Sequence, residues 1–189
     1  MAEIWFSSDH HFHHENIIRY ANRPFSHASE MNDFMIDQHN KFVRPSDHWY
    51  CLGDVTMMRD NKGFGLNVLR GMNGHKRLIL GNHDHYAMKF YLEHFEKVMA
   101  MNVIDNMRFI HIPIHPTSFG GVKATIHGHI HDQDSPPPVM YVDKNQKLVI
   151  KPYINICVER TKYRPITLGE IKVLVKEAID GGSDPTEAV

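Results

Sequence analysis

The sequence predicts an α/β fold in one domain, and three observations lead to that prediction. The first half alternates short apolar runs with stretches of helical periodicity, as in a parallel sheet built from βα units. The second half carries successive apolar runs with few helices between them. At 189 residues the chain is long enough for one domain with a core and short for two. We expect the domain to cover residues 1–180 and a disordered tail to cover 181–189.

The elements expected in the first half alternate between strand and helix. Residues 3–8 form a short apolar run that fits a buried strand, and the aromatic run 48–52 fits a second one. Between them, apolar side chains at helical spacing predict a helix over about 29–43, with Ser29 near its start. The remaining elements of this half are a shorter helix at 62–70, a strand at 77–80 and a helix at about 86–93.

The second half is expected to consist of strands up to its last helix. The strands are expected near 97–104, 107–112, 122–127, 139–142, 147–150 and 153–158. Turn-forming residues at 105–106 and 143–145 separate two pairs of them. A final helix is predicted over about 167–180, because Thr167 and Glu170 form a capping box and apolar side chains line one face.

Composition and charge narrow the class of protein. The formal net charge is −1 and the pI is about 7.0, so no basic field attracts nucleic acid by counterion release, and a nucleic-acid partner is disfavoured. Cys51 and Cys157 lie far from any CxxC spacing and are expected to be buried thiols. The first residues lack a signal sequence, and no apolar run approaches the ~20 residues that span a bilayer. We therefore expect a cytoplasmic protein without a membrane partner.

Five groups of metal-ligand residues occur along the chain, which contains 16 histidines. In chain order the groups are Asp9-His10-His11, Gly53-Asp54, Leu80-Gly81-Asn82-His83-Asp84-His85, His111 and Gly128-His129-Ile130-His131. The first three follow apolar runs that are expected to be strands, so their loops should converge at the carboxyl edge of a sheet, where ligands collect. Together these groups supply seven nitrogen and oxygen donors, which suits a two-metal site.

Each donor has its own chemical use. Asp9 and His11 are two residues apart, so in an extended chain both side chains point the same way and one cation can take both, and the segment 129–131 repeats this spacing. Asp54 has two carboxylate oxygens and can bridge two cations, whereas Asn82 supplies a neutral oxygen that leaves a metal more Lewis acidic. Two cations about 3.5–4 Å apart can hold a hydroxide and neutralise phosphate oxygens during in-line attack. This chemistry needs no protein nucleophile, and the chain has no GxSxG signature.

The five groups, in this order, resemble the motifs of the calcineurin-like metallophosphoesterase superfamily. Its pattern is DxH, GD, GNH followed by D or E, a lone His at a strand end, and GHxH, and the resemblance spans roughly residues 4–160. The segments 12–18 and Arg23-Pro24-Phe25 resemble the small single-domain branch of bacteria and phages. The resemblance implies a four-layer α/β/β/α sandwich with two mixed central sheets.

The resemblance also implies a binuclear centre of two divalent metal ions. One ion would be held by Asp9, His11, Asp54 and His131, and the other by Asp54, Asn82, His111 and His129. His83 would be the catalytic residue beside the substrate phosphate, where it stabilises the transition state or protonates the leaving oxygen, while a bridging hydroxide attacks phosphorus. Mixed nitrogen and oxygen ligation suits Mn²⁺, which we expect first, with Fe, Ni, Co and Zn as alternatives.

The chain departs from the family pattern beside the bridging aspartate. Many members carry an Asp three residues after it, which orients the catalytic His, and then an Arg that contacts phosphate. Met57 and Met58 stand at these positions here, with Arg59 one step later. The group that orients His83 therefore stays open.

Four further residues are expected to contact substrate. They are His14, Asn16, Arg23 and His115. For the first three the alternative is helix capping and surface charge, and for His115 it is a polar position in a loop. We expect His111 rather than His115 to be the metal ligand, because His111 ends an apolar run and His115 lies beyond a proline.

The function expected from these residues is that of a metal-dependent phosphoesterase. The chain has no room for a large cap domain, which favours a phosphodiesterase acting on small substrates such as nucleotides over a phosphomonoesterase. The alternatives are a catalytically inactive scaffold of the same fold that binds proteins, and a zinc-storage or structural metal protein, for which closed tetrahedral sites are typical. A homodimer through the outer surface of either sheet is compatible with the sequence but not required by it.

Overall fold

The computed structural model describes residues 2–181. Its elements are β1 (Ile4–Ser7), α1 (Glu15–Tyr20), α2 (Ala28–Phe42), β2 (His48–Cys51), the 3-10 helix η1 (Phe64–Gly71), β3 (His75–Ile79), α3 (Met88–Leu92), β4 (Lys97–Met99), β5 (Met101–Ile104), β6 (Met107–Ile110), the 3-10 helix η2 (Pro116–Ser118), β7 (Ala124–His127), β8 (Val139–Val142), β9 (Leu148–Lys151), β10 (Tyr153–Asn155), β11 (Ile166–Thr167) and α4 (Leu168–Gly181). Of the tail expected at 181–189, Gly181 is the last residue of α4, and 182–189 lie outside the described residues.

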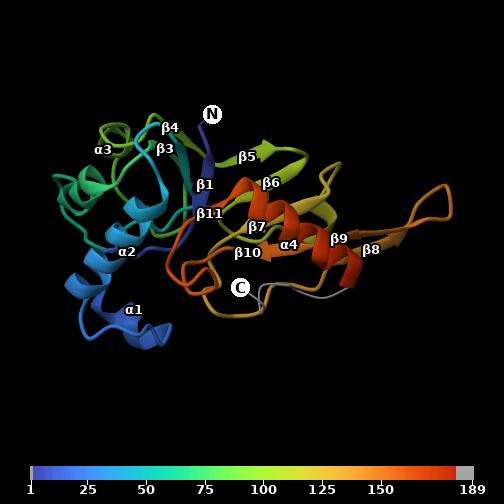
Figure 1. The fold of residues 1–189 in the computed structure, drawn as a ribbon, viewed down its shortest axis with the longest axis horizontal. Coiled ribbons are helices and arrows are strands. Elements are labelled where there is room, and N and C mark those ends of the chain that lie inside the picture. Colours follow the sequence, from blue (N-terminus) through green and yellow to red (C-terminus); the bar gives the residue numbers. More distant parts are fainter. Residues whose placement is uncertain (1, 182–189) are drawn as a thin grey trace.

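The strands form three sheets (Figure 1). The first has the order β11-β1-β2-β3-β4, with β1 to β4 parallel and β11 antiparallel at the edge. The second has the order β10-β7-β6-β5, in which only β5 is antiparallel to its neighbour. β8 and β9 pair as a hairpin that extends away from the rest of the molecule (Figure 1). The α/β class with mixed sheets is confirmed, and the four-layer order stays a prediction.

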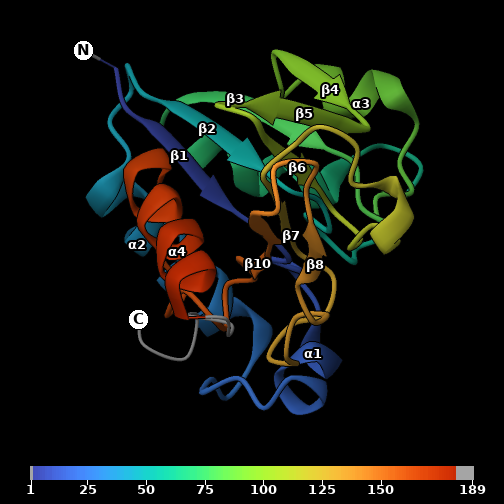
Figure 2. The ribbon, with the colours of Figure 1, turned by 90° about the vertical axis from the view of Figure 1, so that its right-hand side faces the viewer.

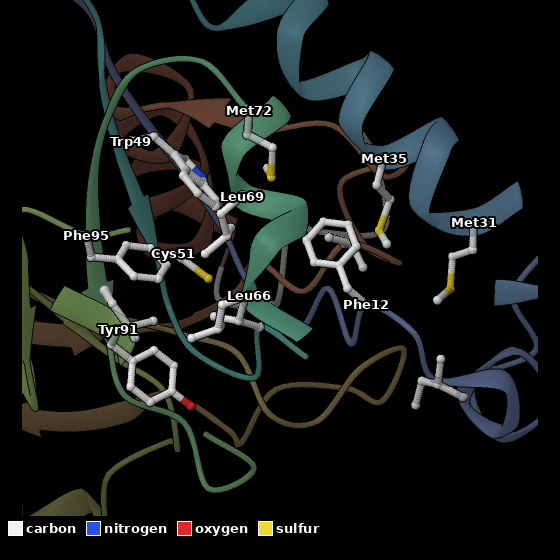
Figure 3. Packing of buried hydrophobic residues seen from close by; sticks show 14 of the residues in the cluster. Phe12, Met31, Met35, Trp49, Cys51, Leu66, Leu69, Met72, Tyr91 and Phe95 are labelled. Carbon is white, nitrogen blue, oxygen red and sulfur yellow. The ribbon is translucent and has the colours of Figure 1, made fainter. Parts of the chain in front are cut away.

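Two hydrophobic clusters lie on opposite faces of the first sheet. Because side chains alternate along a strand, Trp49 and Cys51 of β2 pack on one face with residues of α2 and η1 (Figure 3). Tyr50 and Leu52 face the other way and pack against strands of the second sheet. α4 joins this second cluster and lies against β1, β10 and β11 (Figure 2). The two sheets therefore share a core, and this packing brings their strand ends together.

The expected strand at 97–104 is two strands, which belong to different sheets. β4 pairs in parallel with β3, and after Ala100 the chain continues as β5, which pairs antiparallel with β6. The prediction of one strand was wrong because an apolar run reports burial and not the identity of the neighbouring strand. At Ala100 the chain therefore crosses from the first sheet to the second.

Local signals predicted some elements and missed others. The capping box of α4 is confirmed, since Thr167 Oγ1 accepts from the backbone N of Glu170 at 3.0 Å, and Thr167 N donates to the Glu170 carboxylate. α1 and β11 were not predicted, because both are short and α1 has no side-chain cap at its start.

Within residues 2–181, no helix has the length and apolar character needed to cross a membrane.

Candidate metal centre

The loops after β1, β2, β3, β6 and β7 carry the expected ligands. Backbone hydrogen bonds join these loops to one another, for example from Asp9 N to Gly53 O at 3.1 Å and from His11 N to Asp54 O at 3.0 Å. The backbone N of His129, from the second sheet, donates to Asp9 Oδ2 at 2.9 Å. The strand ends of both sheets thus meet at one place, as expected for a ligand site in an open α/β sheet.

Left-handed backbone recurs at the ligand residues of these loops. The φ angles of Asp9, His11, Asp54, His129 and His131 are 60°, 51°, 53°, 74° and 52°. Non-glycine residues adopt this region at a cost, and such residues cluster at functional sites. The extended-chain argument for the Asp9 and His11 pair was therefore wrong, because tight loops and not an extended strand bring the two side chains together.

Two groups of side chains each have three donor atoms within 4.8 Å of one another. The groups are Asp9 with His11 and His131, and Asp54 with His111 and His129. We call them the Asp9 cluster and the Asp54 cluster. Oδ2 of Asp54 lies 3.5 Å from Nε2 of His11 and 3.4 Å from Nε2 of His111. One carboxylate oxygen thus stands between the two clusters.

Orphaned buried atoms in the Asp9 cluster fit a cation. Asp9 Oδ2 accepts from Ser8 Oγ, from His129 N and from Cys157 Sγ, whereas Asp9 Oδ1 is buried and has no hydrogen-bond partner among the described residues. Both ring nitrogens of His11 are buried and unpaired in the same way. One ion can bind only one nitrogen of an imidazole ring, and Nε2 of His11 lies 3.9 Å from Asp9 Oδ1. Because an unpaired buried polar atom is costly, these two atoms indicate a ligand that satisfies both.

The Asp54 cluster is electrostatically coupled. Burial raises the pKa of the Asp54 carboxyl, but the neighbouring His111 and His11 outweigh burial and lower that pKa to about 2. Burial lowers the pKa of His111, but Asp54 and Asp9 outweigh it and raise that pKa to about 9. Oδ1 of Asn82, the seventh expected donor, lies 2.9 Å from Nε2 of His111. A positive charge is therefore stabilised at this position, whether a proton or a metal ion carries it.

Arg23 lies beneath the site and not in a substrate cleft. Its side chain has no exposed surface. Its guanidinium donates to the carbonyl oxygens of Asp9 and His10 at 2.7 and 2.8 Å, and to Oε1 of Glu159 at 2.7 and 2.9 Å. The expectation that Arg23 contacts substrate was wrong, because every polar contact of this guanidinium is internal.

Two carboxylates of the site were given no role from the sequence. Glu159 Oε1 accepts from Nδ1 of His131 at 3.0 Å; burial lowers the pKa of His131, but this bond outweighs burial and raises that pKa. Asp84 accepts from the backbone N of Gly81, Asp54 and Val55 at 2.8 to 3.0 Å, which joins the loops after β2 and β3. Glu159 follows the buried strand β10, so the signal of a charged residue after an apolar run was available for it.

A cleft of about 510 Å³ opens beside the Asp9 cluster. Its lining includes His11 and His131, and it also includes the predicted substrate contacts His14 and Asn16. His115 is not among the residues that line this cleft. It is exposed and caps η2, where its Nδ1 accepts from Thr117 N. Two of the four expected contacts are thus brought together.

His83 lies between this cleft and a smaller one. It lines both, and the smaller cleft also contains Arg59 and Tyr86. The backbone N of His83 donates to Asp54 Oδ1 at 2.8 Å, which holds the residue beside the cluster. Its ring Nδ1 is buried and has no hydrogen-bond partner within residues 2–181, so no orienting side chain replaces the Asp of the family pattern.

Comparison with known proteins gives one close sequence relative. An uncharacterized protein of Methanocaldococcus jannaschii, MJ1445, is 34% identical over 179 residues, which cover 94% of this chain and 93% of that protein. The chain belongs to that protein's family. No family model matches the chain.

One of two similar solved structures supports the fold. The protein of unknown function AQ665 from Aquifex aeolicus is 26% identical and superimposes with a TM-score of 0.67, covering 92% of this chain and 100% of that one. A novel archaeal phosphodiesterase, 18% identical over 88% of this chain and 99% of its own, has a TM-score of 0.42. At that TM-score the second likeness does not bear on the activity of this chain.

Proposed function

We propose that this chain is a member of the calcineurin-like metallophosphoesterase superfamily and hydrolyses phosphate esters with two divalent metal ions. The observation that carries the proposal is the position of Asp54 Oδ2, 3.5 Å from His11 Nε2 and 3.4 Å from His111 Nε2. A carboxylate oxygen between two donor clusters is what a shared ligand of two cations requires. A storage or structural zinc site is disfavoured, since such sites are closed and tetrahedral.

The donor set divides into two metal positions that share Asp54. The first comprises Asp9, His11, Asp54 and His131, and the second comprises Asp54, Asn82, His111 and His129. The orphaned Asp9 Oδ1 and His11 Nε2, which lie 3.9 Å apart, support the first position. The proximity of Asn82 Oδ1 to His111 Nε2 supports the second. Mixed oxygen and nitrogen donors suit Mn²⁺, with Fe, Ni, Co and Zn as alternatives.

The chain's own residues can orient the substrate and can supply a proton to the leaving oxygen. Two bound cations supply a hydroxide nucleophile at neutral pH and neutralise charge on the phosphate. His83 lines the cleft beside the Asp9 cluster, where its ring can donate to a phosphate oxygen or protonate the leaving oxygen. His14 and Asn16 lie further along the same cleft and can contact the rest of the substrate.

The cleft favours a small substrate. A volume of about 510 Å³ is in the range that accommodates a single small molecule. The net charge of −1 argues against a long nucleic-acid chain as substrate. We therefore propose a phosphodiesterase that acts on small diesters such as nucleotides, in preference to a phosphomonoesterase.

The proposal is tested by hydrolysis of a chromogenic phosphodiester and its matching monoester. Metal-stripped protein is reloaded with Mn²⁺ and assayed beside Asp54→Asn and a matched control, Asp33→Asn, on the exposed side of α2. Metal-dependent diester turnover that is lost only in Asp54→Asn supports a two-metal phosphodiesterase. Preference for the monoester redirects the substrate class. No turnover of either ester with Mn²⁺, Ni²⁺, Co²⁺ or Zn²⁺ overturns the proposal and leaves the inactive scaffold as the better reading.

A further inference from the structure

Arg23 and Glu159 form a buried ion pair that the proposed chemistry does not use. They are 136 residues apart in the sequence. Two nitrogens of the guanidinium donate to Glu159 Oε1, and the two side chains are 0% and 5% exposed. Desolvation offsets much of the attraction in a buried pair, so such a pair is weak evidence for a role in stability.

Both members of the pair contact residues of the Asp9 cluster. The other N–H groups of Arg23 donate to Met31 Sδ and to the carbonyl oxygens of Asp9 and His10, in the loop that carries the expected ligands Asp9 and His11. Glu159 Oε1 accepts from Nδ1 of His131, the third ligand of this cluster. Because Nδ1 is occupied, Nε2 is the nitrogen of His131 that is left for a metal.

In the Asp54 cluster, a backbone carbonyl and not a carboxylate accepts the hydrogen bond from the histidine ring. Nδ1 of His111 donates to the carbonyl oxygen of Leu52 at 2.7 Å, which orients the ring through a neutral group. The two clusters thus differ in the charge of the group behind a histidine. A carboxylate behind a histidine fixes the tautomer and makes the ring a stronger ligand than a neutral acceptor does, and its loss costs about 10- to 100-fold in metal affinity.

We propose that Arg23 and Glu159 are positioning residues for one of the two metal ions, the one at the Asp9 cluster. This inference rests on the proposed two-metal centre and deepens it, because it assigns separate control of the two positions. Glu159 orients His131, and Arg23 holds both Glu159 and the loop that carries Asp9 and His11. The pair therefore sets the affinity of one metal position and leaves the other to its own ligands.

The test is stepwise titration of metal-stripped protein with Mn²⁺, in which calorimetry and electron paramagnetic resonance monitor the binding of each ion. Glu159→Gln keeps the volume and removes the charge. Its matched control is Glu96→Gln, since Glu96 also pairs with Nδ1 of a histidine, His75, but at an exposed position outside both clusters. We expect Glu159→Gln to raise one of the two dissociation constants by roughly 10- to 100-fold and to change the other by less than about 2-fold. Glu96→Gln should leave both unchanged.

Further variants keep the result interpretable. Arg23→Lys keeps the positive charge but cannot reach two carbonyl oxygens and Glu159 together, so it should weaken the same position as Glu159→Gln. The double variant should bind Mn²⁺ at the Asp9 cluster no more weakly than the more affected single variant, because both changes break the same Arg23–Glu159 pair. Thermal unfolding of each metal-free variant identifies any variant that does not fold. If either Glu159→Gln or Arg23→Lys does not fold, the other variant carries the test.

The outcomes separate this inference from the proposed function. If the unaltered protein binds two ions and Glu159→Gln weakens both positions equally, or neither, the inference is overturned while the proposed function stands. If the unaltered protein binds no second ion, the two-metal proposal itself fails, and this inference fails with it.

Discussion

Nε2 of His111 and Oδ1 of Asn82 lie 2.9 Å apart, although Nδ1 of the same ring already donates to Leu52 O. With its one proton on Nδ1, a neutral imidazole turns a lone pair toward the amide oxygen. The contact is favourable only when Nε2 is protonated or a cation lies beside both atoms. In the two-metal centre proposed above, a cation would take the place of that proton, so Asn82 is expected to act through metal binding.

Asn82→Ala should weaken Mn²⁺ binding at the Asp54 cluster and lower diesterase kcat by about 100-fold, since a cation supplies several kcal/mol of charge stabilisation. Titration calorimetry and steady-state kinetics measure the two effects. Asn145→Ala, in the exposed turn between β8 and β9, is the matched control and should change neither. Full activity of Asn82→Ala would exclude Asn82 as a ligand.

His83→Ala should lower kcat by roughly 10²- to 10⁴-fold and leave metal affinity unchanged, because its ring is expected to assist the phosphate chemistry and not to bind a metal. If the ring protonates the leaving oxygen, the loss should shrink for diesters with a more acidic leaving group. His94→Ala, a half-buried histidine after α3, is the control. An equal loss for all leaving groups would assign His83 to phosphate binding instead.

Gly128→Ala should remove the metal position at the Asp9 cluster without unfolding the protein. A Cβ atom at residue 128 would overlap Ser8 Oγ and Asp9 Oδ2, so the Asp9 carboxylate must move. Gly121→Ala places its Cβ in open space and is the matched control. Stepwise Mn²⁺ binding should lose one of two events in Gly128→Ala only, and two intact events would contradict the expectation.

His14→Ala should raise KM for a nucleotide diester severalfold and leave metal affinity unchanged, because His14 lines the cleft. His115→Ala should leave KM unchanged, because His115 caps η2 and is absent from the cleft lining. Initial-rate kinetics on one diester compares the two variants directly. A larger effect at His115 would place the substrate elsewhere.

Asp47→Asn should destabilise the fold by about 1–3 kcal/mol at neutral pH and flatten its acid sensitivity. Asp47 is buried and accepts from Arg44, Glu3 N and Trp5 Nε1. The hydrogen bond from Arg44 holds the pKa of Asp47 well below its usual value despite burial. A carboxyl whose pKa is lower in the folded state stabilises the protein above its unfolded pKa of about 3.9, and this contribution is lost as pH falls further. Thermal unfolding between about pH 7 and pH 2 measures this loss, with Asp33→Asn as control. A variant as acid-sensitive as the unaltered protein would contradict the assignment.

Much of the candidate site could be predicted because each ligand motif is contiguous and follows an apolar run. Asp9, Asp54 and Asn82 follow the first three predicted strands, and the structure brings all three loops together. Partners that are distant in the sequence could not be predicted in this way. Nothing in the local pattern of Arg23 or Glu159 indicates that the two side chains meet. Arg23 was for that reason placed in the cleft, although it lies beneath the site.

The sequence by itself determined the α/β class, the order of the ligand motifs and the helix that Thr167 and Glu170 begin, because these depend on side chains within a few residues of one another. The division of the motifs around Asp54 was already implied by the family resemblance. Only the tertiary structure decided that tight left-handed loops bring Asp9 and His11 together, that Arg23 meets Glu159, and that the run at 97–104 splits between two sheets. These features depend on which strands pair and which loops touch. Packing between distant segments determines the strand pairing and the loop contacts, and local periodicity in the sequence does not predict either.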